Sequence, residues 1–246
     1  AHQWRAMRPI QKILRDVREG KFGNLLRIGT RPKDDSRGGG EELILHGTHL
    51  FDLMMAFCGD PRWVSAHITD GGIDVTAAHV PQGTQPVGHI AGDSISASLG
   101  FDGGVRGFFE STGNLAGLRG SHFDNLYGVS IECERVSLEL REPGDAYIYP
   151  APRVLPDLEA LKWKKVLLPE WHGRYDTDEF RRNWLHIGNQ ILVTDLISAI
   201  EEDREPLSSI ESVRFVNEMV QGAYLSHLSG GERLCIPLSE RVHPLA

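Results

Sequence analysis

The chain has 246 residues, of which 40% are hydrophobic and 24% charged, as is typical of a soluble globular protein. Its 34 acidic residues outnumber 26 basic residues and give a formal net charge of −8, which argues against binding nucleic acid or an anionic membrane surface. No apolar run approaches the roughly 20 residues of a membrane helix, and no signal peptide is visible. Cys58, Cys133 and Cys235 lie far apart and predict core thiols of a cytoplasmic protein.

The first part of the chain predicts alternating helices and strands. Residues 9–19 place apolar side chains at helical spacing behind a proline, and residues 24–30 alternate as in a strand. Residues 43–58 again have helical spacing, and residues 63–69 alternate. Residues 70–92 are rich in glycine, proline and threonine and predict a long loop.

The second part predicts hairpins followed by two helices. The expected elements are a hairpin over 94–109 that turns at 102–104, a hairpin over 128–140 that turns near 134–135, strands at 146–150 and 162–169, helices over 187–200 and from Ser208 to Gly230, and a strand at 234–238. Ser208 and Glu211 have the spacing of a capping box. This order predicts one α+β domain over residues 1–246, with an open, mostly antiparallel sheet and helices on one face.

Motifs of the common nucleotide-binding and hydrolase folds are missing. No G-x-G-x-x-G joins a strand to a helix, and neither a P-loop nor a G-x-S-x-G elbow occurs. The glycine-rich stretch 113–120 has the wrong spacing. We therefore expect that this chain does not bind a dinucleotide on its own by a recognised route.

The stretch HGTHLFD, residues 46–52, admits three interpretations. His46 and His49 are either polar residues of a buried helix, metal ligands of a hydrolase together with Asp52, or proton-transfer groups. Metal-binding helices more often space their histidines four residues apart, with a glutamate between them. An imidazole pKa near ~6.5 suits acid–base catalysis at neutral pH.

Neighbouring residues offer further contacts to a ligand. The Gly38–Gly40 run lets the backbone come close to a bound molecule. Lys33 and Arg37 could bind hydroxyls or carboxylates, or they could belong to a solvated charged loop. His186, beside Trp184, fits either a sugar contact or a helix entry packed on the core.

Residues 38–66, GGGEELILHGTHLFDLMMAFCGDPRWVSA, resemble the second domain of the glucose–fructose oxidoreductase/inositol dehydrogenase/MocA family. That family carries GG-x-L-x-D-x-G-x-H-x-x-D, followed by a glycine and a proline. The matching positions are Leu43, Gly47, His49, Asp52, Gly59 and Pro61. Residues 10–28 and 192–238 are also similar to the corresponding parts of the family.

The resemblance implies a two-domain oxidoreductase whose NAD- or NADP-binding Rossmann domain lies outside this chain. The present domain would hold a sugar or polyol, and its open sheet would pack against another subunit in a homo-oligomer. In the family, a lysine of the nucleotide domain and the histidine that matches His49 flank the reacting hydroxyl. His49 is therefore the catalytic candidate, and Lys33, Arg37, His46 and His186 are candidates for substrate binding.

Two departures from the family pattern leave other functions open. Leu45 stands where the family has an aspartate four residues before the histidine, and the glycine run lies one residue further away. Glu42 or His46 could replace that carboxylate. The alternatives are a non-catalytic module for carbohydrate binding or subunit association, and a metal-dependent hydrolase that uses His46, His49 and Asp52.

Overall fold

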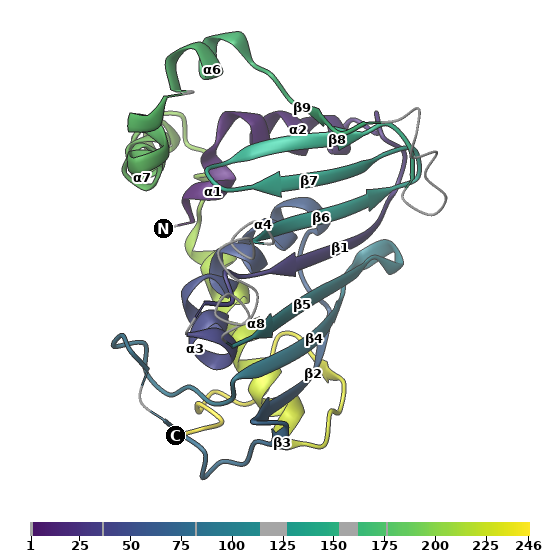
Figure 1. Ribbon diagram of the computed structural model, residues 1–246, viewed down its shortest axis with the longest axis vertical. Helices are drawn as coiled ribbons and strands as arrows, with labels where there is room; N and C mark the ends of the chain where they lie inside the picture. The colour runs from purple at the N-terminus through teal and green to yellow at the C-terminus, as the bar shows by residue number, and fades with distance from the viewer. Residues whose placement is uncertain (1, 36, 82, 114–126, 153–161, 176) are drawn as a thin grey trace.

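The computed structural model describes all residues except 1, 36, 82, 114–126, 153–161 and 176 (Figure 1). The strands are β1 (Leu25–Arg31), β2 (Trp63–Asp70), β3 (Ile73–Asp74), β4 (Ser94–Gly100), β5 (Arg106–Thr112), β6 (Gly128–Cys133), β7 (Ser137–Arg141), β8 (Asp145–Tyr149), β9 (Lys164–Lys165) and β10 (Leu234–Cys235). The helices are α1 (Gln3–Ala6), α2 (Arg8–Arg18), α3 (Gly38–Leu45), α4 (Gly47–Cys58), α6 (Pro169–Tyr175), α7 (Asp178–Glu201) and α8 (Ile210–Leu228).

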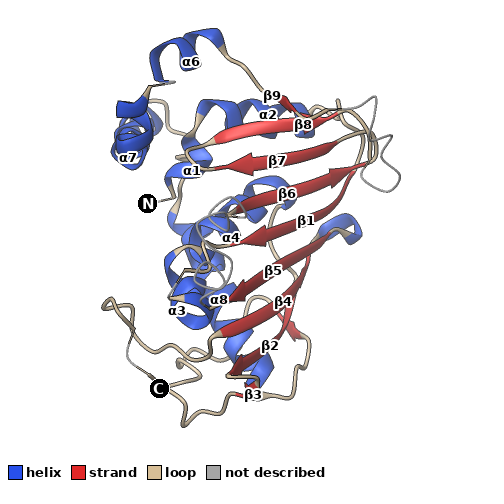
Figure 2. Ribbon diagram, in the orientation of Figure 1, coloured by secondary structure: helices blue, strands red, loops and turns tan. Residues whose placement is uncertain are grey.

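The strands form one open sheet in the order β10-β2-β4-β5-β1-β6-β7-β8-β9, with β3 paired to β2. Among the described strands, β1 and β5 are the one parallel pair; the other pairs are antiparallel. The long helices lie to one side of the sheet (Figures 1 and 2). The predicted fold class, an open and mostly antiparallel sheet with helices on one face, is confirmed.

The first predicted hairpin shows how alternation positions the core. Ile95 and Leu99 of β4 are buried toward the helices, whereas Ser96 is exposed on the opposite face. On β5, Phe109 is fully buried and contacts Phe51 of α4, with ring centroids 5.2 Å apart. Burial of each such side chain stabilises the fold by roughly 1.5–3 kcal/mol, so the α4–sheet contact is strongly determined by the sequence pattern.

β1 departs from its predicted alternation. Its pairing with β6 shifts between Leu25 and Arg27, and an irregularity of this kind turns the following side chains to the other face. Ile28 is consequently buried, while Leu26, expected on the same face, is 51% exposed.

Helix positions differ from the prediction in three places. The helix expected over 43–58 begins earlier, at Gly38, and is interrupted locally at His46. Helix α7 begins at Asp178, and α8 is capped by Ser209, whose hydroxyl accepts a bond from the Ser212 N–H at 3.2 Å. The predicted capping box at Ser208 is therefore wrong by one residue.

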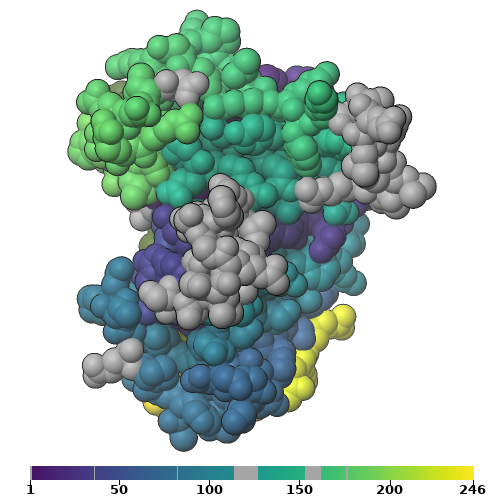
Figure 3. All heavy atoms as spheres, viewed as in Figure 1, coloured from purple at the N-terminus to yellow at the C-terminus, as the bar shows by residue number. Residues whose placement is uncertain are grey.

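Other elements were not predicted, or were predicted too long, because their sequence patterns are too short to be distinctive. Helices α1 and α6 have too few residues for a periodic pattern, and the strand expected at 162–169 is reduced to β9. The predicted apolar stripe of α7 stays largely exposed in the described part of the chain, with Ile200 at 73%. In the space-filling view of Figure 3, the green atoms of the later helices lie above the teal atoms of the strands.

The exposure of the three cysteines tests the prediction that they are core thiols. Cys133 is buried, as expected for a core thiol, and Cys58 is partly buried, but Cys235 is exposed and the core prediction for it is wrong. Among the described helices, none combines the length and the apolar character that crossing a bilayer requires.

Candidate functional site

The glycine run at the start of α3 is required by close backbone packing. Gly39 has φ of 53°, and a Cβ there would lie 2.3 Å from the Gly92 carbonyl oxygen. A Cβ on Gly38 would lie 1.9 Å from the Cα of Gly113. The backbone thus approaches neighbouring loops of this same chain, and these contacts explain the glycines without a bound molecule.

Glu42 of α3 connects His46 to the loop that carries Lys33 and Arg37, called the binding loop below. Its carboxylate is fully buried and lies 2.7 Å from His46 Nδ1, one helical turn further along. It also lies 3.3 Å from Arg37 Nε and accepts a 3.3 Å bond from the Lys33 backbone N–H. One carboxylate therefore brings together three of the predicted site residues, Lys33, Arg37 and His46. From the sequence, Glu42 was only a possible replacement for the missing aspartate.

Lys33 extends this cluster toward the later strands. Its Nζ lies 3.4 Å from the carboxylate of Glu142 and 5.4 Å from the ring centroid of Tyr127. The same carboxylate accepts a 3.1 Å bond from the indole N–H of Trp184. Tyr127 contacts His46, with ring centroids 5.1 Å apart, so the contacts close into a compact polar and aromatic cluster. Glu142 was missed from the sequence because its approach depends on the sheet order.

His49 lies on the next helical turn and is only partly exposed. Its Nδ1 is buried and has no hydrogen-bond partner among the described residues. Burial lowers the pKa of His49 to about 3, with smaller contributions from the nearby His2 and His46. The His2 ring meets it edge-on at a centroid distance of 5.2 Å. The imidazole is consequently neutral at any ordinary working pH.

The third member of the metal-site alternative has other partners. Asp52 is fully buried, and its carboxylate accepts a 2.8 Å bond from Arg5 Nε and lies 3.2 Å from His2 Nδ1. His46 is bound to Glu42. In the described ranges, no group of three or more histidine, cysteine, aspartate or glutamate residues is placed to hold a metal ion.

Asp34 is a buried acid that sequence reasoning missed. Its Oδ1 accepts bonds of 2.8 Å from the Ser111 hydroxyl and 2.9 Å from the Thr112 N–H. Its Oδ2 is buried without a hydrogen-bond partner in the described part of the chain. Burial raises the pKa of Asp34 from 3.8 to about 6, despite the opposing effects of these bonds. Nothing in the polar stretch PKDDSR indicates which aspartate is buried.

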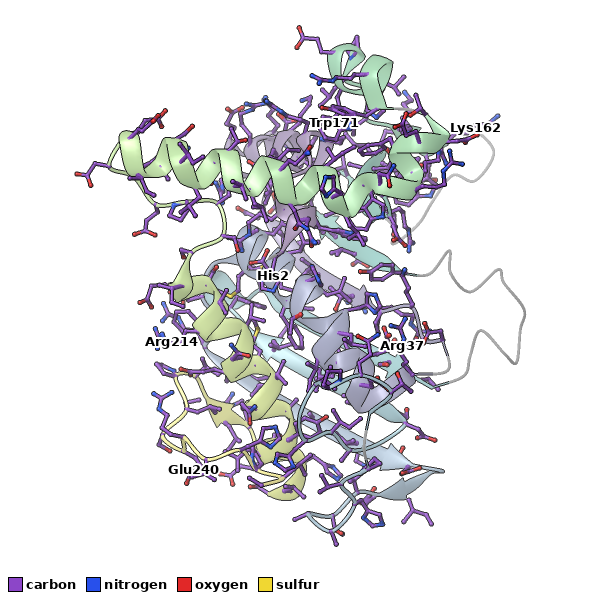
Figure 4. All side chains as sticks on the ribbon, turned by 90° about the vertical axis from the view of Figure 1, so that its left-hand side faces the viewer. His2, Arg37, Lys162, Trp171, Arg214 and Glu240 are labelled. Carbon is purple, nitrogen blue, oxygen red and sulfur yellow. The ribbon has the colours of Figure 1, made fainter. Side chains whose placement is uncertain are left out.

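The remaining predicted contact, His186, makes its side-chain hydrogen bond outside this cluster. It is exposed on α7, and its Nε2 lies 3.3 Å from Gln190 Nε2. Trp184, by contrast, is 6% exposed and packs against Trp4 at a centroid distance of 6.1 Å. The core-packing interpretation of Trp184 is the one the structure shows. Figure 4 shows α7 above the region of His2 and Arg37.

Several solved structures of oxidoreductases share this fold. An oxidoreductase domain protein from Kribbella flavida is 18% identical over 96% of this chain and 66% of its own, with a TM-score of 0.64. A levoglucosan dehydrogenase in complex with NADH and levoglucosan is 15% identical over 96% of this chain and 65% of its own, with a TM-score of 0.59.

A third similar structure is the WlbA dehydrogenase from Bordetella pertussis in complex with NADH and UDP-GlcNAcA. It is 16% identical over 97% of this chain and 64% of its own, with a TM-score of 0.57. The chain thus spans just under two-thirds of the length of the solved chains it matches. A scan of protein families finds no match. A search of curated proteins finds none either.

The residues of this chain do not fit a dinucleotide by themselves. A dinucleotide site is built from parallel strands joined by a crossover helix behind a glycine-rich turn. The described sheet has one parallel pair, β1 with β5, and the sequence lacks the G-x-G-x-x-G signature.

Proposed function

We propose that this chain is the substrate-holding domain of an NAD- or NADP-dependent oxidoreductase of the glucose–fructose oxidoreductase/inositol dehydrogenase/MocA family, acting on a hydroxyl of a sugar or polyol. The observation that carries the proposal is the gathering of ionisable side chains around the α3–α4 turn, in a fold shared with dehydrogenases. Similar structures contain NADH with levoglucosan or with UDP-GlcNAcA. The nucleotide itself would be bound by a separate domain.

His49 is the proposed acid–base residue. Its Nδ1 has no hydrogen-bond partner among the described residues, and this supports the role, because a buried polar atom in that state is suited to receive a partner from a ligand. A neutral imidazole accepts a hydrogen bond from a substrate hydroxyl. As negative charge develops on that oxygen, the opposite charge favours the imidazolium, so the proton moves to the ring when the alkoxide forms.

Lys33, Arg37 and His46 are the proposed substrate-binding residues. Their side chains are partly exposed, at 30%, 21% and 18%, which supports contact with a bound molecule. Glu42 holds the loop and the helix in fixed relation. His186 remains a weaker proposal, since its position on α7 is exposed and separate from these contacts.

A homo-oligomer is proposed through the open face of the sheet. Residues that point away from the helices include Ser96 and Ser98, which are small and polar. Arg27 lies 3.3 Å from Glu132 and 4.7 Å from the Phe108 ring centroid on the same face. A surface with paired charges and small side chains can be matched by a second copy of itself.

A non-catalytic binding module is the second candidate, and one observation favours it. No carboxylate orients the His49 ring among the described residues, because Glu42 is bound to His46 and Asp52 to Arg5. An imidazole whose pKa is about 3 is a weak base. In this alternative the same cluster binds a carbohydrate without transforming it.

Measuring turnover by the full-length protein distinguishes the catalytic domain from the non-catalytic binding module. We expect reduction of NAD or NADP, followed by nicotinamide absorbance, with at least one member of a panel of sugars and polyols. His49→Ala should lower kcat by about 100-fold or more, the usual contribution of acid–base catalysis, while the protein stays folded at the assay temperature. His79→Ala, at an exposed loop histidine, is the matched control. Near-normal turnover of His49→Ala would refute the catalytic role.

A further inference from the structure

The charges around the proposed substrate site point to one class of substrate. Resting on the proposed function, we infer that the site takes an uncharged sugar or polyol and discriminates against sugar acids and phosphorylated sugars. The observation behind this inference is that each cation of the binding loop is already paired with a carboxylate of the same cluster.

The ammonium of Lys33 is held by Glu142. The two groups are 3.4 Å apart, and the Glu142 carboxylate is fixed in turn by the indole N–H of the buried Trp184 at 3.1 Å. The ammonium also lies over the face of Tyr127. An anionic ligand would have to displace a carboxylate that has a second hydrogen bond, or share the ammonium with it at close range.

The guanidinium of Arg37 is occupied in the same way. Its Nε donates to both carboxylate oxygens of Asp35, at 2.9 and 3.1 Å, and its Nη2 bonds the same carboxylate. The carboxylate of Glu42 lies 3.3 Å from Nε on the other side. The Arg37 contact holds the pKa of Asp35 below its usual range, so this carboxylate is ionised at neutral pH. Few N–H donors of the Arg37 guanidinium therefore remain for a ligand carboxylate or phosphate.

The described carboxylates of the cluster outnumber its permanent cations. Glu142, Asp35 and Glu42 face the two cations Lys33 and Arg37. The buried Asp34 adds another acid, and its own cation Arg31 lies 3.8 Å away, so the acids still outnumber the cations by one. Carboxylate oxygens accept hydrogen bonds from neighbouring hydroxyls of a polyol, and such an uncharged ligand adds no negative charge to the cluster. An added anion meets like charges in a partly desolvated place, where such a contact is strongly unfavourable.

Matched ligand pairs test the inference on this chain. The probes are glucose with glucuronate, galactose with galacturonate, and sorbitol with gluconate, titrated separately and followed by heteronuclear NMR and calorimetry. We expect the neutral member of at least one pair to bind about ten-fold more tightly than its acid. Tighter binding of the acids overturns the inference and leaves the proposed function standing. Binding of none of the probes counts against the proposed function, and the inference falls with it.

A charge-removing variant makes the cause explicit. Glu142→Gln keeps an acceptor for Trp184 and frees the ammonium of Lys33. It should strengthen binding of the sugar acid about ten-fold relative to its neutral partner, and added salt should weaken that gain. Glu232→Gln, at an exposed position two residues before the edge strand β10, is the control and should change the binding of neither ligand. An unchanged ratio in Glu142→Gln contradicts the proposed cause.

Discussion

Asp34 makes the free energy of unfolding depend on pH, and a single substitution can remove this contribution. The residue is 1% exposed and has φ of 52°, in the left-handed region. Asparagine is among the few side chains that tolerate this conformation, so Asp34→Asn removes the charge without straining the backbone. Its amide oxygen can still accept the bonds from Ser111 and Thr112.

The magnitude follows from the pKa of Asp34, which burial raises from 3.8 to about 6. The folded state therefore holds the proton more tightly than the unfolded state. Stability is greatest below the unfolded pKa and falls as the pH rises toward about 6, by a total of about 3 kcal/mol. The lowered pKa of His49 acts in the opposite direction over part of this range, so only the difference between wild type and variant isolates Asp34.

The assay is urea unfolding of both proteins at about pH 4 and about pH 8. Asp34→Asn should gain about 2.5 kcal/mol relative to wild type between the two conditions, because more than half of the unfolded-state Asp34 is already ionised at about pH 4. Asp35→Asn is the matched control, because its pKa is lowered by Arg37 and its relative stability should shift in the opposite direction. A stability difference between wild type and Asp34→Asn that is equal at both pH values would refute the reasoning.

Two further predictions concern the rest of the fold. His227 accepts a 3.1 Å bond from the Ile68 N–H through Nδ1 and lies 2.9 Å from the Val75 carbonyl through Nε2, so His227→Ala should cost about 3 kcal/mol in urea unfolding. A loss below about 1 kcal/mol would show that water replaces both bonds. In thiol titration of the native protein, exposed Cys235 should react first, whereas burial raises the pKa of Cys133 to about 11 and should keep it unreactive until unfolding. Equal rates would contradict the burial assigned to Cys133.

The elements whose signals are local were predicted well. The alternation around Ile95 and Leu99 requires a strand with one buried face, and Asp102-Gly103-Gly104 turns the chain back to β5. Since such patterns depend on neighbours only a few residues away, they can be read without tertiary information. The fold class follows from them, because successive hairpins place their apolar sides on the same face.

The capping of α8 and the face of β1 depended on details beyond local pattern. Ser208 and Ser209 are adjacent and chemically equivalent as caps, and only the path of the preceding loop selected Ser209. Leu26 became exposed because of a shift in pairing with β6, a strand about 100 residues later in the chain. Spacing in β1 alone contains no information about that partner.

The sequence by itself determined that His46, His49, Lys33 and Arg37 occur near one another along the chain, because they lie within 17 positions on a loop and the helix that follows. Tertiary structure alone decided that Glu142, in the turn between β7 and β8, closes the cluster. It also decided which of two adjacent aspartates is buried. Charge pairing and desolvation are set by groups distant in sequence, and so these properties had to await the folded arrangement.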